Sequence, residues 1–200
     1  MSAVSFRPED ILHFWFGGPG DPPLRHAQRW YAKDAAFDDE CRTRFLAALE
    51  AAIGGGLDEL RKSARGRLAL VLLLDQISRN VFRDSPRAFA QDGLARDIAL
   101  EAMNAGDERM LSLVERSFLY MPLMHAEDAN LQHGCVAAFA RLVAEAPPEL
   151  KSYFENGLSY AKRHEEIVER FGRFPHRNAI LGRESTREEV AFLEEPGSSF

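Results

Sequence analysis

The stretch that decides the fold is Leu68-Ala69-Leu70-Val71-Leu72-Leu73-Leu74, which runs directly into Asp75-Gln76-Ile77-Ser78-Arg79-Asn80. Apolar residues occupy every side of this run, so a helix over about residues 65–83 would be buried all round. The run is far shorter than the roughly 20 residues that span a bilayer. It therefore predicts the central helix of a water-soluble helical core.

The rest of the chain repeats apolar residues at three- and four-residue steps, and no segment alternates as a strand does. Pro8 opens a first helix that Gly17 ends, and Asp34 is placed to cap a long one. Asp92 is predicted to cap the helix of residues 94–103. The other expected features are a short helix at Trp30 and Tyr31, a stop at Gly54-Gly55-Gly56, a capping box of Ser112 with Glu115, a break at Pro122, helices over about residues 126–146 and 149–171, and a final helix signalled by Ser185 with Glu188.

Composition bounds the class of protein. The chain has 200 residues, of which 46% are hydrophobic and 28% charged, so we expect one all-α domain over residues 1–200. Residues 1–10 lack the basic stretch and apolar core of a secretory signal, so we expect a cytoplasmic protein. Cys41 and Cys135 stand alone, which argues against a disulfide framework or a thiolate zinc site. We expect neither a cofactor nor a bound metal.

The charge of the chain limits the classes of partner that it is expected to bind. A formal net charge of -6 disfavours nucleic acid, because such binding neutralises many phosphates. Membrane binding is disfavoured as well, since no helix combines a basic face with a strongly apolar one. The 25 cations are 21 Arg and 4 Lys, and arginine suits bidentate recognition of carboxylate or phosphate. For surface arginines, an Ala- and Arg-rich composition is the simpler explanation.

Three expected helices carry polar residues in register with an apolar face. These residues are Asp75 and Arg79 on the central helix, Asp128 with His125 and Gln132 one turn to either side, and His164 in line with Ile167 and Val168. A carboxylate buried without a partner would cost several kcal/mol or become neutral. Asp75 and Asp128 should therefore each find a cation or several hydrogen-bond donors.

A segment near the C-terminus, Phe171-Gly172-Arg173-Phe174-Pro175-His176-Arg177-Asn178-Ala179-Ile180-Leu181-Gly182-Arg183, mixes apolar anchors with cations. This mixture is typical of an anion-binding wall or of an architectural lock, meaning ion pairs that only fasten the chain together. We infer one shared polar cluster. Its candidate ligand-binding residues are Asp75, Gln76, Arg79, Asn80, Arg83, His125, Asp128, Gln132, His164, Arg173, His176, Arg177, Asn178 and Arg183.

Five blocks of the sequence carry a resemblance to a known family. Residues 73–83 (LLDQISRNVFR), 118–128 (FLYMPLMHAED) and 170–178 (RFGRFPHRN) resemble signature blocks of the bacterial family known as domain of unknown function 924. Residues 11–17 resemble its opening and residues 182–189 its close. The resemblance implies a tetratricopeptide-like array of about eight to ten antiparallel helices. It implies no activity, because none is assigned to the family.

The sequence is compatible with three functional hypotheses. The leading hypothesis is a pocket for a small phosphate- or carboxylate-bearing ligand, which Arg79, Arg173 and Arg177 would clamp. His125, His164 or His176 would be available as acid or base there.

The two alternatives come from different classes of protein. One is a metal-assisted hydrolase that uses His125, Asp128, His164 and Asp75, whose nitrogen and oxygen atoms suit a divalent metal. The other is a non-catalytic scaffold, in which the cluster is a lock and a helical surface holds a protein partner. The sequence leaves open whether any reaction is catalysed, and it leaves the oligomeric state open.

Overall fold

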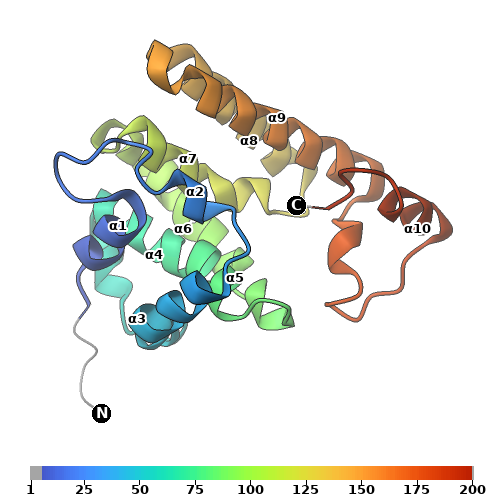
Figure 1. Ribbon diagram of the computed structural model, residues 1–200, viewed down its shortest axis with the longest axis horizontal. Coiled ribbons are helices and arrows are strands. Elements are labelled where there is room, and N and C mark those ends of the chain that lie inside the picture. The colour runs from blue at the N-terminus through green and yellow to red at the C-terminus, as the bar shows by residue number, and fades with distance from the viewer. Residues whose placement is uncertain (1–5, 200) are drawn as a thin grey trace. The chain divides into compact units, whose positions relative to one another are not determined.

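The computed structural model describes residues 6–199, and within this range its regular elements are helices (Figure 1). The prediction of an all-α fold is confirmed, while the tetratricopeptide-like arrangement stays a prediction. The expectation for the first ten residues falls partly on residues 1–5, outside the described range. No helix of the described residues is both long and apolar enough to cross a membrane.

The chain divides into two compact units. The N-terminal unit runs up to Arg83 and continues over Arg87–Pro122, and the C-terminal unit holds Asp84–Pro86 and the chain from Leu123 on. The single domain over residues 1–200 stays a prediction. The helices are α1 Pro8–Phe16, α2 Ala27–Trp30, α3 Ala35–Ile53, α4 Ala64–Val71, α5 Ser78–Val81, α6 Asp92–Ala105, α7 Leu113–Met124, α8 Ala129–Glu145, α9 Pro148–Phe171 and α10 Arg187–Leu193.

The central helix of the N-terminal unit is interrupted by a π-helical turn. This turn, Leu72–Ile77, joins α4 to α5, and every residue of 68–74 is at most 2% exposed. The Ser78 hydroxyl donates to the Leu74 carbonyl oxygen, 2.6 Å away. Such a bond to the carbonyl four residues back competes with the backbone ladder, and π turns recur at functional sites. The predicted buried helix is confirmed, but its π turn was not foreseen.

Local capping explains most of the helix starts. The Asp34 carboxylate accepts from the Ala36 and Phe37 amides at 2.9 and 3.3 Å, as predicted. The Ser112 amide donates to Glu115 at 2.8 Å, and the Glu115 amide donates back to the Ser112 hydroxyl at 3.3 Å, which confirms the capping box.

Three boundary predictions need correction. Asp92 is the first residue of α6 and not its cap, because its carboxylate pairs with Arg79. Pro122 lies inside α7, which continues to Met124. The capping box of α10 is Thr186 with Glu189, one residue later than the predicted pair, because the Ser185 hydroxyl accepts from Asn178 instead.

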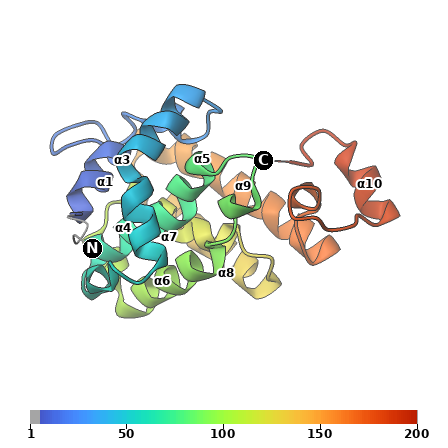
Figure 2. The ribbon, with the colours of Figure 1, turned by 90° about the horizontal axis from the view of Figure 1, so that it is seen from below.

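The C-terminal unit is built on α8 and α9, which pack side by side (Figures 1 and 2). A core of Ile167, Val168 and Phe174 forms at the end of α9, with Phe171 and Phe192 packed against it. Phe174 belongs to the chain after α9, where a 3-10 turn, Pro175–Arg177, follows. The apolar anchors predicted for this segment are therefore confirmed at Phe171 and Phe174.

Candidate functional site

The predicted residues of the N-terminal unit form a connected set of hydrogen bonds, which we call the π-helix network: Asp75, Gln76, Arg79, Asn80 and Arg83 with Asp38 and Asp92. Arg79 reaches both oxygens of Asp92, at 2.9 and 3.0 Å, and the carbonyl oxygen of Asp75 at 2.8 Å. Its guanidinium also lies 3.3 Å from the Asp75 carboxylate, which is fully buried. Burial lowers the pKa of Arg79, but these two carboxylates raise it above its ordinary value.

The polar groups of Arg83, Asn80 and Gln76 in the π-helix network are also hydrogen-bonded. Arg83 donates to both oxygens of Asp38, at 2.5 and 2.7 Å, and to the Asn80 side chain at 3.1 Å. Asn80 donates to the Gln76 carbonyl oxygen at 3.0 Å, and Gln76 donates to the Asp75 carboxylate at 2.5 Å. The donors and acceptors of these residues thus satisfy one another, as an architectural lock requires.

A second set lies in the C-terminal unit around the Phe174 ring, and we call it the histidine cluster: His125, His164, His176 and Arg177. The Phe174 ring centroid lies 5.4 Å from that of His164 and 5.6 Å from that of His176. The Arg177 guanidinium lies over the same ring, 4.5 Å from its centroid, and donates to the His125 carbonyl oxygen at 3.1 Å. These four members of the predicted cluster thus lie together in the C-terminal unit, whereas the predicted residues from Asp75 to Arg83 belong to the N-terminal unit. The single shared cluster stays a prediction.

Two imidazoles of this cluster, His164 and His176, are neutral near pH 7. The pKa of His164 is lowered to about 3, mainly by burial and in part by the charges of His125 and Arg177, although the hydrogen bond to Tyr160 opposes this shift. Burial and then the charge of Arg177 lower the pKa of His176 to about 4. His164 Nδ1 lies 2.8 Å from the Tyr160 carbonyl oxygen, which can only accept, so Nδ1 carries the proton. The cluster consequently joins a buried cation to uncharged ring nitrogens.

This burial predicts how stability depends on pH. The unfolded chain protonates His164 near pH 6.5 and the folded chain only near pH 3, so the unfolded state binds more protons between these values. The free energy of unfolding should fall as the pH falls, by about 2 kcal/mol at pH 5 from this residue alone. Urea denaturation at pH 7 and pH 5 measures this loss. The loss should shrink in His164→Asn and persist in His133→Asn, and equal losses in all three proteins would refute the assignment.

The remaining predicted residues of this unit are paired or serve as caps. Arg173 meets both oxygens of Glu189 at 2.6 and 2.8 Å, and Arg183 meets both of Glu127 at 2.7 and 2.9 Å. The backbone amide of Phe174 also donates to Glu127, at 2.8 Å. Glu127 thus fastens the chain after α9, although sequence reasoning assigned that kind of role to its neighbour.

The structure corrects the prediction for that neighbour, Asp128. It is exposed and caps α8 by accepting from the Leu131 amide at 3.0 Å, so it is not a buried carboxylate on the apolar face. Gln132 is fully buried as expected. Its amide group donates to the carbonyl oxygens of Leu123, Met124 and Ala126, which joins the end of α7 to α8.

The ligands suggested for a metal-assisted hydrolase do not come together. Within residues 6–199, three potential ligand atoms lie within 4.8 Å of one another only at His133, Glu165 and Glu169. His125, Asp128 and His164 form no such group. The geometry of this unit therefore gives the hydrolase hypothesis no support.

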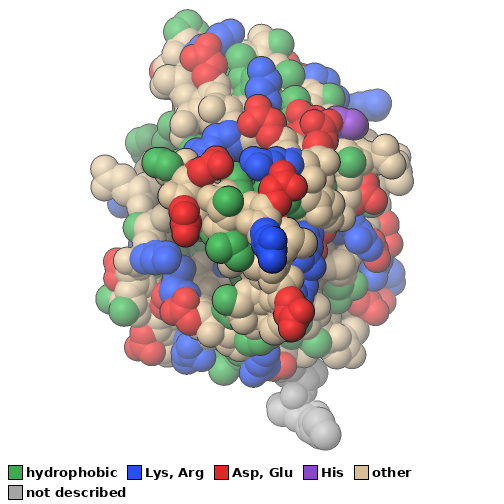
Figure 3. Space-filling model, turned by 90° about the vertical axis from the view of Figure 1, so that its right-hand side faces the viewer, with side chains coloured by type: hydrophobic (Ala, Val, Ile, Leu, Met, Phe, Trp, Pro, Cys, Tyr) green, Lys and Arg blue, Asp and Glu red, His purple; other side chains and the backbone are tan. Residues whose placement is uncertain are grey.

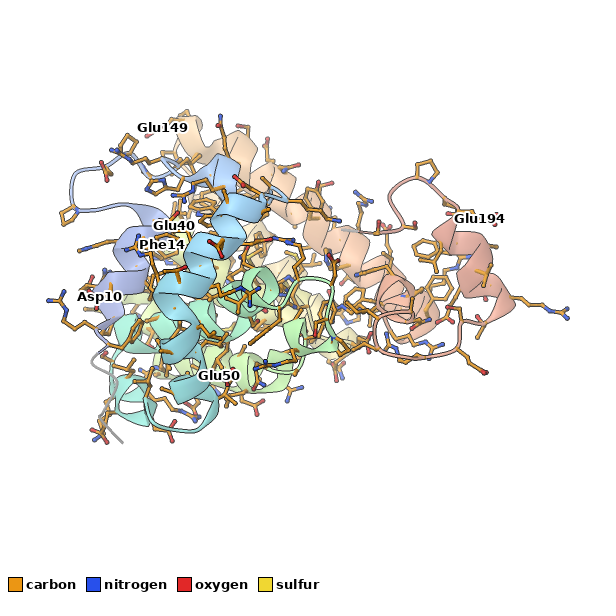
Figure 4. All side chains as sticks on the ribbon, turned by 60° about the horizontal axis from the view of Figure 1, so that its bottom comes forward. Asp10, Phe14, Glu40, Glu50, Glu149 and Glu194 are labelled. Atoms are coloured by element: carbon orange, nitrogen blue, oxygen red, sulfur yellow. The ribbon has the colours of Figure 1, made fainter. Side chains whose placement is uncertain are left out.

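Sequence reasoning missed a cavity in the N-terminal unit, which we call the Phe14 cavity. It has a volume of about 430 Å³, within the range of small-molecule sites. Figure 4 labels Asp10, Phe14 and Glu40, which come from the facing helices α1 and α3. The lining residues are Glu9, Asp10, His13, Phe14, His26, Arg29, Glu40 and Arg44.

Two arginines dominate one side of this cavity. Arg29 donates to one oxygen of Glu40 at 2.5 Å, and Arg44 donates to the other at 3.2 Å. The Arg44 guanidinium lies 4.5 Å from the centroid of the Phe14 ring, and that of Arg29 lies 4.3 Å from the centroid of the Phe37 ring. The aromatic rings thus hold both cations in place.

One sequence signal could have pointed to this cavity. Asp10 and Phe14, like Glu40 and Arg44, are four residues apart and share a helix face. Arg29 comes from the short helix α2, so three helices have to be placed before the set becomes visible. Figure 3, which views the molecule from the right-hand side of Figure 1, shows why a cation alone is a poor signal, since positive and negative side chains lie next to one another there.

Comparison with known proteins assigns the family. The sequence model of a bacterial family described as "Bacterial protein of unknown function (DUF924)" matches residues 11–197. The chain belongs to this family. This DUF924 chain is similar to a protein whose structure is solved. That protein is ATU0120 from Agrobacterium tumefaciens, which is described as being of unknown function. The two are 41% identical with a TM-score of 0.79, and the match covers 94% of this chain and 96% of the other.

None of the curated proteins matches this DUF924 chain. Both the family and the Agrobacterium protein are described as being of unknown function, so neither supplies an activity. The family and the all-α fold predicted from the sequence are confirmed by these comparisons and by the structure.

Proposed function

We propose that this DUF924 protein binds a small phosphate- or carboxylate-bearing ligand in the Phe14 cavity, with Arg29 and Arg44 as the principal donors. One observation carries the proposal: these two guanidinium groups share a single carboxylate, and each uses one nitrogen. Four of the five arginines predicted from the sequence meet carboxylates through two nitrogens each: Arg79 with Asp92, Arg83 with Asp38, Arg173 with Glu189, and Arg183 with Glu127. The fifth, Arg177, donates to the carbonyl oxygen of His125.

The charge balance favours an anion at this place. Arg29 and Arg44 contribute two positive charges and Glu40 one negative charge, which leaves one positive charge. A guanidinium has five N–H donors, and among the described residues Glu40 is the only hydrogen-bond acceptor of either arginine. Their side chains are 37% and 48% exposed, so a ligand can reach the remaining donors. Charge-assisted bonds of this kind are stronger than neutral ones.

The acidic residues of the cavity are engaged elsewhere and compete little for the arginines. Both oxygens of Glu9 accept from Arg65, at 2.7 and 2.6 Å, and this pairing lowers the pKa of Glu9. Asp10 accepts from the side chain and the amide of Arg7 at 2.8 and 3.1 Å. The cationic side of the cavity therefore faces carboxylates that are already neutralised.

His26 gives the site a titratable group. Burial lowers its pKa, and the charges of Arg29 and Arg25 lower it further. A bound anion would offset these positive charges and raise the pKa of His26, so ligand binding should be accompanied by proton uptake. A neutral imidazole beside an anion is also suited to act as an acid or base, although the proposal is binding and leaves catalysis open.

Isothermal titration calorimetry with inorganic phosphate and with sulfate, at constant ionic strength, tests the proposal. We expect saturable binding that Arg29→Ala and Arg44→Ala each weaken by roughly 10-fold or more, since a hydrogen bond to a charged group contributes about 1.5–3 kcal/mol. The matched control is Arg87→Ala. Arg87 also lies over an aromatic ring, that of Phe82 at 3.8 Å, and also pairs with a glutamate, Glu50 at 2.5 Å, but does not line the cavity.

Two results would overturn the assignment. Wild-type protein that binds neither anion at millimolar concentration would reject the site. Binding that survives both cavity variants but is lost in Arg177→Ala would move the ligand to the histidine cluster, which stays the sequence-based candidate. That cluster holds a cation only 6% exposed among three imidazoles. A tetratricopeptide-like scaffold for a protein partner also stays a prediction.

A further inference from the structure

We infer that the paired helices α8 and α9 carry a binding site for a divalent transition metal, with His133, Glu165 and Glu169 as ligands and Zn²⁺ as the ion they suit best. The three ligand atoms, one imidazole nitrogen and two carboxylate oxygens, lie within 4.8 Å of one another. This site belongs to the C-terminal unit and is independent of the Phe14 cavity.

The backbone brings these ligands together. Glu165 and Glu169 are four residues apart on α9 and therefore lie on one helix face. His133 comes from α8, which packs against α9 (Figure 2). Its Nε2 atom lies 2.8 Å from Glu169 and 3.6 Å from Glu165. Ligand atoms of a tetrahedral site with bonds of about 2.1 Å are separated by about 3.4 Å. The two observed distances bracket this separation, and the two carboxylate oxygens lie within 4.8 Å of each other, so the three atoms are close enough to converge on one ion.

The electrostatics of the group favour a cation. Two carboxylates face one imidazole, whose Nε2 atom lies 2.8 Å from Glu169 and 3.6 Å from Glu165. A divalent ion would neutralise both carboxylates at once.

The exposure of the ligands indicates an open site. His133 is 56% exposed and Glu169 51%, while Glu165 is 20% exposed. Three protein ligands leave at least one position for water, as in catalytic zinc sites, whereas structural zinc sites are closed by four protein ligands. An imidazole nitrogen is a ligand that suits Zn²⁺, and the affinity of such a site should be lower for Mn²⁺ than for Co²⁺.

The test uses full-length, tag-free protein freed of metal with a chelator. Calorimetric titration with Zn²⁺ should give one ion per chain, and Zn²⁺ should raise the melting temperature in a concentration-dependent way. His133→Ala and Glu169→Gln should each weaken Zn²⁺ binding by more than about 100-fold. This exceeds the effect of losing a residue that only hydrogen-bonds to a metal ligand, which is at most about 100-fold. Both side chains are exposed, so folding should survive either change.

Glu166→Gln is the matched control, because Glu166 is an exposed glutamate on the same helix outside the group. It should bind Zn²⁺ as the wild type does. The inference is overturned if wild-type protein binds no Zn²⁺, or if one-to-one binding persists in His133→Ala and Glu169→Gln. Binding without fixed stoichiometry that all variants share would likewise overturn it, since it would be adventitious adsorption to surface carboxylates.

Discussion

Replacing Gly66 with alanine is expected to destabilise the N-terminal unit by about 3 kcal/mol, at the upper end of the cost of overpacking. Intrinsic helix propensity predicts the opposite sign, because alanine is favoured over glycine by about 1 kcal/mol inside a helix such as α4. The close contact between Gly66 and the preceding chain outweighs this propensity and sets the sign of the effect. A Cβ atom on Gly66 would lie 2.0 Å from the carbonyl oxygen of Leu60 and 2.8 Å from its carbonyl carbon. These are backbone atoms, which cannot rotate away as the end of a side chain can.

Urea denaturation of Gly66→Ala beside Gly93→Ala measures this effect with a matched control. Gly93 also lies in a helix, α6, but a Cβ atom there would have no heavy atom within 4 Å. Gly93→Ala should therefore benefit from the higher helix propensity of alanine without a clash, which stabilises the protein by about 0.5–1 kcal/mol. A Gly66→Ala protein at least as stable as the wild type would show that the chain before α4 moves away at little cost.

Features that depend on neighbours within four residues were predictable from the sequence. The Asp34 cap and the capping box of Ser112 with Glu115 are of this kind, and both formed as expected. Two of the predictions that failed involve competition from residues farther along the chain. Asp92 has good cap chemistry, but it pairs with Arg79, 13 residues away, and Ser185 accepts from Asn178, 7 residues away.

The buried central helix was predictable for a different reason, since a run apolar on every side can only be placed in a core. Its π turn was not, because hydrophobic periodicity does not distinguish a π turn from an α turn over six residues. The Ser78 hydroxyl bond to Leu74 that accompanies it also forms in ordinary helices. Nothing in the local sequence therefore separates the two geometries.

The candidate sites show the same limit. Polar residues in register with apolar faces were recognisable, and two of the predicted residues, His164 and Arg177, both lie against the Phe174 ring. Their carboxylate partners were not recognisable, because partners such as Asp38 for Arg83 lie 45 residues away along the chain. The Phe14 cavity was missed for this reason too, since three helices supply its lining.

Removal of Arg79 is expected to have the second large effect, a loss of about 3–5 kcal/mol in the free energy of unfolding for Arg79→Ala. Arg79 donates to both oxygens of Asp92 and to the backbone of Asp75, whose carboxylate is 0% exposed. Taking away one partner of a buried charge pair leaves desolvated charge behind, which costs more than the pair itself contributes. Lysine would keep the charge but not the planar fork, so Arg79→Lys should be intermediate.

Arg96→Ala is the control, because Arg96 and Asp97 form an exposed pair, 38% and 57% accessible, on the surface of the same unit. Its loss should cost about 0.5 kcal/mol or less. The comparison also decides what the π-helix network is for. Residues held in place for a ligand generally cost stability, so an Arg79→Ala protein that is as stable as the wild type would indicate a binding site. A large loss, with the small loss at Arg96, would identify the Asp75–Arg79–Asp92 network as an architectural lock. An anion would then have to bind outside this network, as the proposal for Arg29 and Arg44 expects.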